Sequence, residues 1–249
     1  MQTTAKVELS VEVLHQALAL LDLGEPHALF TGGERYYSPR FKQESDAALH
    51  RALHAAGVGG PHGVDPAFAD LLTVMQRRHV EFYGWMQDAE GPYSVLTAAS
   101  GRAAVLAERV RDTVTFEWID ANRLLDAFLH RLPTTPPARG EALSVRIEDL
   151  EPPTGDLLMR RSAAADRPPA ARRLDMLLKA ERVGGAKLYT AKRDVYGKRV
   201  RAQSWVDVID LREGRWALHK PAGQPFVTAV PGTPQVIGTR LSELQAGLH

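Results

Sequence analysis

The feature of the sequence that most constrains the fold is an order of segments that occurs twice. Apolar and polar residues alternate across residues 79–118, with turn signals at Ser100-Gly101 and Arg111-Asp112, and this pattern predicts four short antiparallel strands. A second set of strands is expected at 186–194, 198–209, 214–220 and 225–230. Each set precedes an amphipathic helix, the first capped by Asp120 and the second opening at Thr233.

Helix and strand signals also precede each set. Those before the first set predict a strand at Lys6–Leu9 and three helices, which start at Ser10, Ser38 and Asp65. Those before the second set predict a strand over Leu143–Ile147 and a helix over Ala170–Arg182, which Gly184-Gly185 closes. The order of strand, helix, four strands and helix is therefore shared by both parts of the chain.

The two parts also match at individual residues. At one constant offset Gly101-Arg102 falls on Gly214-Arg215, and Val114-Thr115 falls on Val227-Thr228. Under the same offset the capping residues Asp120 and Thr233 coincide. We interpret the agreement of turn, strand and cap as an internal duplication.

These patterns predict an α+β fold with a central, largely antiparallel sheet and flanking helical bundles, arranged as two pseudo-symmetric halves. The expected N-terminal half is 1–132 and the C-terminal half is 142–249, joined by a proline-rich linker at 133–141. We expect the helices to pack against one side of the sheet and at its ends, and the halves to form one compact unit.

The composition and the missing motifs exclude several classes of function. The chain has no cysteine and a formal net charge of +1, so thiol chemistry is excluded and no strong overall field favours nucleic acid. No phosphate-binding loop, nucleophile elbow or complete metal motif is present. We therefore expect no enzyme activity, no cofactor and no metal. The absence of a signal peptide and of a long apolar run predicts a cytoplasmic protein without a membrane segment.

Large aromatic residues fall on strand faces that otherwise read as polar. Val80, Phe82 and Met86 share one face of the first predicted strand, whereas Tyr83 and Trp85 share the other. Two interpretations stay open: core packing, if helices cover both faces of the sheet, or a partner-binding face, because such side chains are common interface anchors. The candidate partner-binding residues are Tyr83, Trp85, Tyr189, Trp205 and Asp207.

One basic segment, residues 192–201, favours an alternative function. It reads as a hairpin that turns around Gly197, and such a hairpin could clamp nucleic acid while Tyr196 stacks on a base. Basic residues on an edge hairpin also discourage aggregation, and a single patch in a nearly neutral chain argues against nucleic acid as the partner.

Three segments resemble the EspG family of type VII (ESX) secretion. They are VELSVEVLHQALALLDLGE near the N-terminus, SGRAAVLAERVRDTVTFEWIDANRLLDAFLHRLP at the end of the first half, and GGAKLYTAKRDVYGKRVRAQSWVDVIDLREGRWAL in the second. The resemblance extends from about Val7 to Gly247 and includes the duplicated layout.

The resemblance implies a cytosolic chaperone from actinobacteria that binds a helical client, such as a PE–PPE heterodimer, and delivers it for export. It implies neither ATP nor a metal, and it leaves a homodimer open. Members of the family use a long loop in client recognition, whereas the turn at Asp88–Pro92 is short here. No individual binding residue is therefore transferred from the family.

Overall fold

The computed structural model describes residues 6–32, 42–61, 63–150, 167–221 and 223–248. The helices are α1 (Val11–Leu20), α2 (Lys42–Ala55), α3 (Pro66–Gln76), α4 (Leu124–Leu129), α6 (Pro169–Lys179) and α7 (Pro234–Ala246). The expected start of α2 at Ser38 lies outside the described residues. Asp65 accepts hydrogen bonds from the backbone N–H groups of Ala67 and Phe68 and so caps α3 as predicted.

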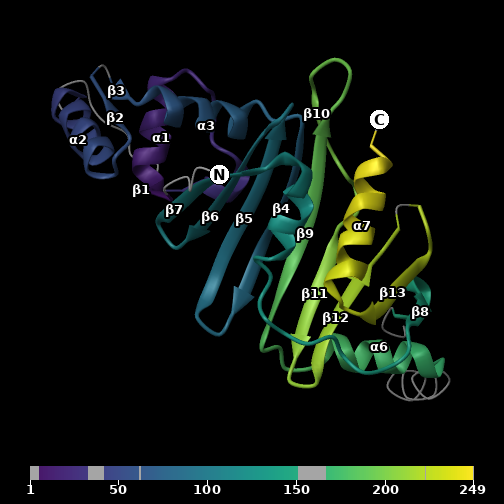
Figure 1. Ribbon diagram of the computed structural model, residues 1–249. Helices are drawn as coiled ribbons and strands as arrows, with labels where there is room; N and C mark the ends of the chain where they lie inside the picture. Colours follow the sequence, from purple (N-terminus) through teal and green to yellow (C-terminus); the bar gives the residue numbers. More distant parts are fainter. Residues whose placement is uncertain (1–5, 33–41, 62, 151–166, 222, 249) are drawn as a thin grey trace.

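One eleven-stranded sheet forms the centre of the molecule (Figure 1). Its strands in the first half are β1 (Val7–Ser10), β4 (Val80–Asp88), β5 (Gly91–Ser100), β6 (Ala103–Val110) and β7 (Thr113–Asp120). Those in the second half are β8 (Leu143–Arg146), β9 (Gly184–Arg193), β10 (Arg199–Arg201), β11 (Val206–Leu211), β12 (Gly214–His219) and β13 (Phe226–Pro231). A separate pair, β2 (Gly59–Gly60) and β3 (Gly63–Val64), lies among the N-terminal helices.

The order of strands in the sheet is the same in both halves when each is counted from the centre outward. The full order is β1-β7-β6-β5-β4-β9-β11-β12-β13-β8, with β10 paired to β9. All pairings between the described strands are antiparallel, and β4 and β9 join the halves. The sequence prediction of a large antiparallel sheet with several helices is confirmed.

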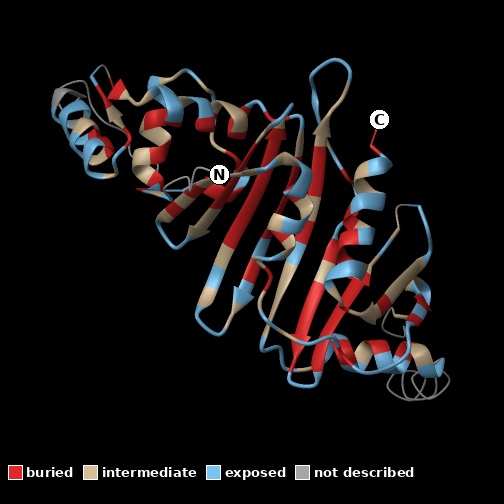
Figure 2. Ribbon diagram, in the orientation of Figure 1, coloured by how far each residue is buried: buried red, intermediate tan, exposed pale blue. Residues whose placement is uncertain are grey.

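Helices cover both faces of the sheet, which differs from the expected packing on one side. α4 and α7 pack on the face that carries Phe82 and Val208. α1, α2 and α3 pack on the opposite face against the first-half strands, and α6 packs on the second-half strands around Ile209. Figure 1 shows the N-terminal helices at one end of the sheet and α6 at the other. No described helix covers the middle of the face that carries Ile209, and the strands there contain exposed as well as buried residues (Figure 2).

Two predicted boundaries are wrong. The helix α6 ends at Lys179, and Gly184 and Gly185 begin β9 instead of closing the helix. The expected strand at 198–209 is interrupted, because residues 202–205 separate β10 from β11. On β9 the same interval is only two residues, since Arg201 pairs with Ala191 and Val206 with Leu188. The extra residues bulge from the sheet and move Trp205 out of the regular ladder.

The proline-rich segment 133–141 lies along β12. The backbone N–H of Arg215 donates to the carbonyl of Pro136 at 2.7 Å, and the N–H of Ala138 donates to the carbonyl of Arg215 at 2.8 Å. The Arg215 side chain adds a bond from Nη2 to the carbonyl of Pro133 at 2.6 Å. This segment therefore connects the halves while it is hydrogen-bonded to the second one.

Candidate functional site

The five candidate residues that alternation indicated lie together on one face of the sheet, around the pairing of β4 with β9 and β11. Tyr83 on β4 is directly opposite Tyr189 on β9, and Trp85 is opposite Lys187. Lys187 is in turn opposite Asp207 on β11. Because Trp205 immediately precedes β11, its ring reaches Tyr189, with 6.1 Å between the centroids. We call Tyr83, Trp85, Tyr189, Trp205 and Asp207 the aromatic strip.

Each aromatic ring of the strip contacts at least one other ring of the strip. Tyr83 and Tyr189 stack with 5.3 Å between their centroids and an interplanar angle of 15°. The Trp85 ring meets Tyr189 edge-on at 5.7 Å. Offset stacking and edge-to-face contacts are the favoured arrangements of aromatic pairs, so the strip is an ordered surface with defined ring positions.

Burial differs sharply along the strip. Tyr83 is 3% exposed and belongs to the core beneath the N-terminal helices, whereas Trp85 is 44% exposed and Trp205 is 38% exposed. The core interpretation therefore holds for Tyr83, and the two tryptophans keep much of their surface in water. Indole surface of this size is costly to hydrate and is a frequent anchor in protein interfaces.

Cationic side chains lie over the ring faces. The Lys187 Nζ is 4.9 Å from the centroid of Trp205, and the guanidinium groups of Arg199 and Arg201 are 5.4 and 5.5 Å from Tyr83 and Tyr189. Asp207 accepts a hydrogen bond from the Trp205 Nε1 at 2.7 Å, which fixes the indole. The strip is therefore amphipathic, with apolar rings beside positive charge.

A buried ionic cluster lies beside Tyr83, at the end of the strip nearest β10. Glu81 is 1% exposed, forms an ion pair with Arg78, and accepts a hydrogen bond from the Arg199 Nε at 2.6 Å. Burial, together with the charges of Arg78 and Arg199, lowers the pKa of His27 from its ordinary value to about 2. The sequence prediction missed this cluster, because Arg199 lies far from Glu81 along the chain and no local pattern links the two.

Two hollows flank Trp85. One has a volume of about 400 Å³ and is lined by Arg78, Arg193, Arg199 and Arg201 together with Tyr83 and Trp85. The other, of about 320 Å³, lies between Trp85, Arg182 and Asp207 over glycine-rich backbone. A protruding indole with a hollow on each side is a surface that could receive side chains of a partner.

The basic hairpin at 192–201 uses part of its charge internally. Arg193 donates from Nε to the carbonyl of Arg78 at 3.0 Å and from Nη1 to the carbonyl of Gly197 at 2.5 Å. The hairpin projects beyond the sheet (Figure 1), and Val195 and Tyr196 at its tip are 93% and 92% exposed. The tip of the hairpin therefore exposes two large uncharged side chains, Val195 and Tyr196.

The remaining sequence features form no further site among the described residues. Over the described ranges, no group of three or more His, Cys, Asp or Glu residues is placed to hold a metal ion. In that same portion of the chain, no helix combines the length and the apolar character that crossing a membrane would require. The turn between β4 and β5 is tight, since Asp88 accepts hydrogen bonds from the N–H groups of Glu90 and Gly91.

The fold places the chain in a class of α+β proteins built on one large antiparallel sheet with helices on both faces. The family model for EspG matches residues 10–243, so the chain belongs to the EspG family of type VII secretion chaperones. Members of this family are chaperones and not enzymes, in agreement with the prediction from the sequence.

A solved structure has the same fold. It contains the Mycobacterium tuberculosis type VII secretion system chaperone EspG5 in complex with the PE25–PPE41 dimer. The TM-score is 0.70 at 16% sequence identity, over 96% of this chain and 95% of the EspG5 chain. No curated protein matches the chain significantly.

Proposed function

We propose that the chain is a cytoplasmic chaperone that binds a helical secretion client, such as a PE–PPE heterodimer, on the aromatic strip. Binding there would keep the client soluble and present it for export. The observation that carries the proposal is the exposure of Trp85 and Trp205 on the part of the sheet that no described helix covers. Membership of the EspG family and the fold shared with an EspG5 chain solved in complex with a PE–PPE dimer support it.

The geometry suits a helical partner. The exposed rings lie between α1–α3 at one end and α6 at the other, so the strip is a bounded surface. A helix that lies on such a surface offers side chains at i, i+3, i+4 and i+7, which can occupy the hollows on either side of Trp85. Apolar rings would supply most of the binding energy and the surrounding cations would orient the client.

The test is co-expression with PE–PPE-like or WXG-type proteins encoded beside this gene. A stoichiometric complex is expected with the cognate client. Trp85→Ala and Trp205→Ala, made separately, should each abolish it while thermal stability changes little. Met176→Ala is the matched control, because Met176 on α6 is a 64% exposed apolar side chain outside the strip. Clients that purify alone and soluble, or tryptophan variants that bind normally, would refute the proposal.

Nucleic-acid binding through residues 192–201 is the weaker alternative. Its support is the basic composition of the hairpin, but Arg193 and Arg199 already bond backbone carbonyls and Glu81. The alternative predicts an affinity that falls steeply with salt. A mobility-shift measurement at low salt decides it, and no shift would remove it.

We also infer that the two halves arose by duplication and pack as one unit, with 1–132 and 142–249 as the repeats and 133–141 as the connection. The mirrored strand order on either side of the β4–β9 pair supports this inference. α4 and α7, which end the halves, also pack on the same face. An alignment of EspG family members in which the profile of one half fails to match the other would count against it.

A further inference from the structure

The hollow beside Tyr83, at the end of the aromatic strip nearest β10, is lined by four arginines. Its wall includes Arg78, Arg193, Arg199 and Arg201, and we call it the arginine pocket. Glu25 is the only carboxylate in the described lining. Glu81 lies beneath, where it is shared by Arg78 and Arg199. The four guanidinium charges therefore outnumber the nearby carboxylates, and the pocket is positive.

Two of these positive charges have no carboxylate partner among the described residues. Arg193 donates to the backbone carbonyls of Arg78, Gly197 and Gln76, which orient it but do not neutralise it. Arg201 is exposed, and its guanidinium lies over the Tyr189 ring at 5.5 Å. Because a cation–π contact leaves the charge of the guanidinium intact, Arg201 can still pair with an acid.

The pocket wall also contains polar atoms without hydrogen bonds in the described structure, namely His27 Nε2 and Gln76 Oε1. His27 is only 6% exposed. Its Nδ1 accepts from the backbone N–H of Leu29 at 3.2 Å, so the ring proton is on Nε2. The nearest carboxylate oxygen, on Glu81, is 3.5 Å away. Because His27 Nε2 is fully buried and faces Glu81, it belongs to the floor of the pocket, and the groups that a ligand can reach are the guanidinium groups.

We propose that the arginine pocket binds an aspartate or glutamate side chain from the helical surface of the client, beside the contact that the client makes with Trp85. A carboxylate matches the positive charge of the pocket and the bidentate geometry of its guanidinium groups. The adjacent indole fits the apolar neighbours of that acid on an amphipathic helix. The pocket would thus select clients by charge, and the aromatic strip would supply the apolar contact. This inference rests on the proposed function.

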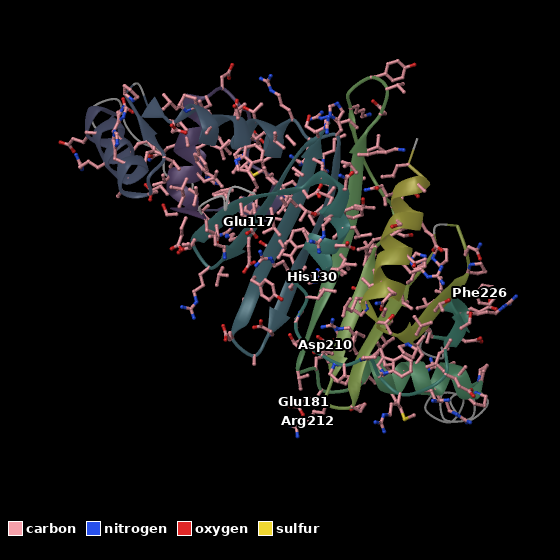
Figure 3. The ribbon with its side chains drawn as sticks, viewed as in Figure 1. Glu117, His130, Glu181, Asp210, Arg212 and Phe226 are labelled. Carbon is pink, nitrogen blue, oxygen red and sulfur yellow. The ribbon has the colours of Figure 1, made fainter. Side chains whose placement is uncertain are left out.

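The experiment compares variants of the client complex by titration calorimetry, with the client that co-purifies as the ligand. Arg201→Ala should weaken binding about ten-fold and reduce its dependence on salt, and Arg201→Glu should weaken it further. Both variants should melt like the wild type, because Arg201 is exposed. Arg212→Ala is the matched control, since Arg212 is exposed and lies with Glu181 at the opposite end of the sheet (Figure 3). It should bind normally.

Charge exchange identifies the acid on the client. Each Asp or Glu of the client that faces the chaperone is changed to Lys, and one such change should restore binding to Arg201→Glu. A client with residues added after its C-terminus should bind normally, because the proposal assigns the carboxylate to a side chain. Loss of binding on that extension, or no single rescue, would overturn the assignment.

The outcomes separate this inference from the proposed function. If Trp85→Ala abolishes binding while Arg201→Glu binds like the wild type, the aromatic strip is the client site and the arginine pocket is not part of it. If neither variant affects binding, both proposals fail.

Discussion

Tyr83 of β4 and Tyr189 of β9 stack face to face where the two halves of the sheet meet, with 5.3 Å between the ring centroids. Tyr83 is buried, whereas Tyr189 is only partly buried. One pair therefore joins the core beneath the N-terminal helices to the exposed tryptophans. The stability of the β4–β9 pairing and the shape of the candidate client surface therefore depend on the same stacked rings.

Replacement of Tyr83 should test its role in the core. Tyr83→Ala removes a buried ring and should lower the free energy of unfolding by about 3 kcal/mol, measured by urea denaturation. Tyr83→Phe keeps the ring and should cost less than about 1 kcal/mol. A loss below about 1 kcal/mol for Tyr83→Ala would show that the ring is not part of the core.

Loss of one partner of the buried Asp210–Arg215 pair should destabilise the second half. The two side chains are 0% and 2% exposed, and Arg215 donates from Nε and Nη2 to the two carboxylate oxygens at 2.6 and 2.7 Å. Arg215→Met leaves Asp210 buried without its cation and should cost about 3–5 kcal/mol in urea denaturation.

The double variant Asp210→Leu with Arg215→Met removes both charges and should be more stable than Arg215→Met alone. Arg212→Ala, in an exposed pair with Glu181, should change stability by less than about 1 kcal/mol and is the control. Additive losses in the double variant would contradict the predicted coupling between the two groups.

Stability should fall as the pH drops below about 6.5, partly because of His27. The folded state lowers the pKa of His27 to about 2, so the unfolded chain takes up the proton first and unfolding is favoured as the pH falls. From pH 7 to pH 5.5 this effect should cost about 1 kcal/mol.

His27→Gln should remove that part of the pH dependence, measured as the difference in unfolding free energy between the two pH values. His50→Gln is the control, since His50 lies on α2, outside the ionic cluster. Equal pH dependence in the wild type and His27→Gln would mean that folding does not lower the pKa of His27.

Gly101 and Gly214, which coincide in the two halves of the sequence, should respond differently to alanine. Gly101 has a φ of +61° in an open turn with no atom near an added Cβ, so Gly101→Ala should cost about 1–2 kcal/mol. Gly214 has a φ of +131°, and an added Cβ would lie 2.6 Å from the Cα of Ala138.

Gly214→Ala should therefore cost more than Gly101→Ala and should also loosen the 133–141 segment. Thermal unfolding and proteolysis within that segment measure the two effects. Equal losses, with no added proteolysis for Gly214→Ala, would show that the segment does not depend on its close approach to β12.

The local rules of secondary structure were sufficient for most of the elements. The helices capped by Asp65 and Thr233 begin where the sequence predicted. The side chain of an N-cap bonds a backbone N–H only two or three residues further on, so the signal is local. Alternation with tight turns predicted β4 to β7 for the same reason. It could not locate the interruption at 202–205, because that bulge depends on how β9 pairs with two strands at once.

The sequence by itself determined which residues share a strand face, since side chains alternate with a period of two. It therefore grouped Tyr83 with Trp85 and Trp205 with Asp207. Only the tertiary structure decided that Tyr83 is buried while the tryptophans stay exposed, because burial depends on where distant helices pack. It also brought Arg199 to Glu81 and so formed the ionic cluster, since long-range contacts between charged groups leave no local periodicity in the sequence.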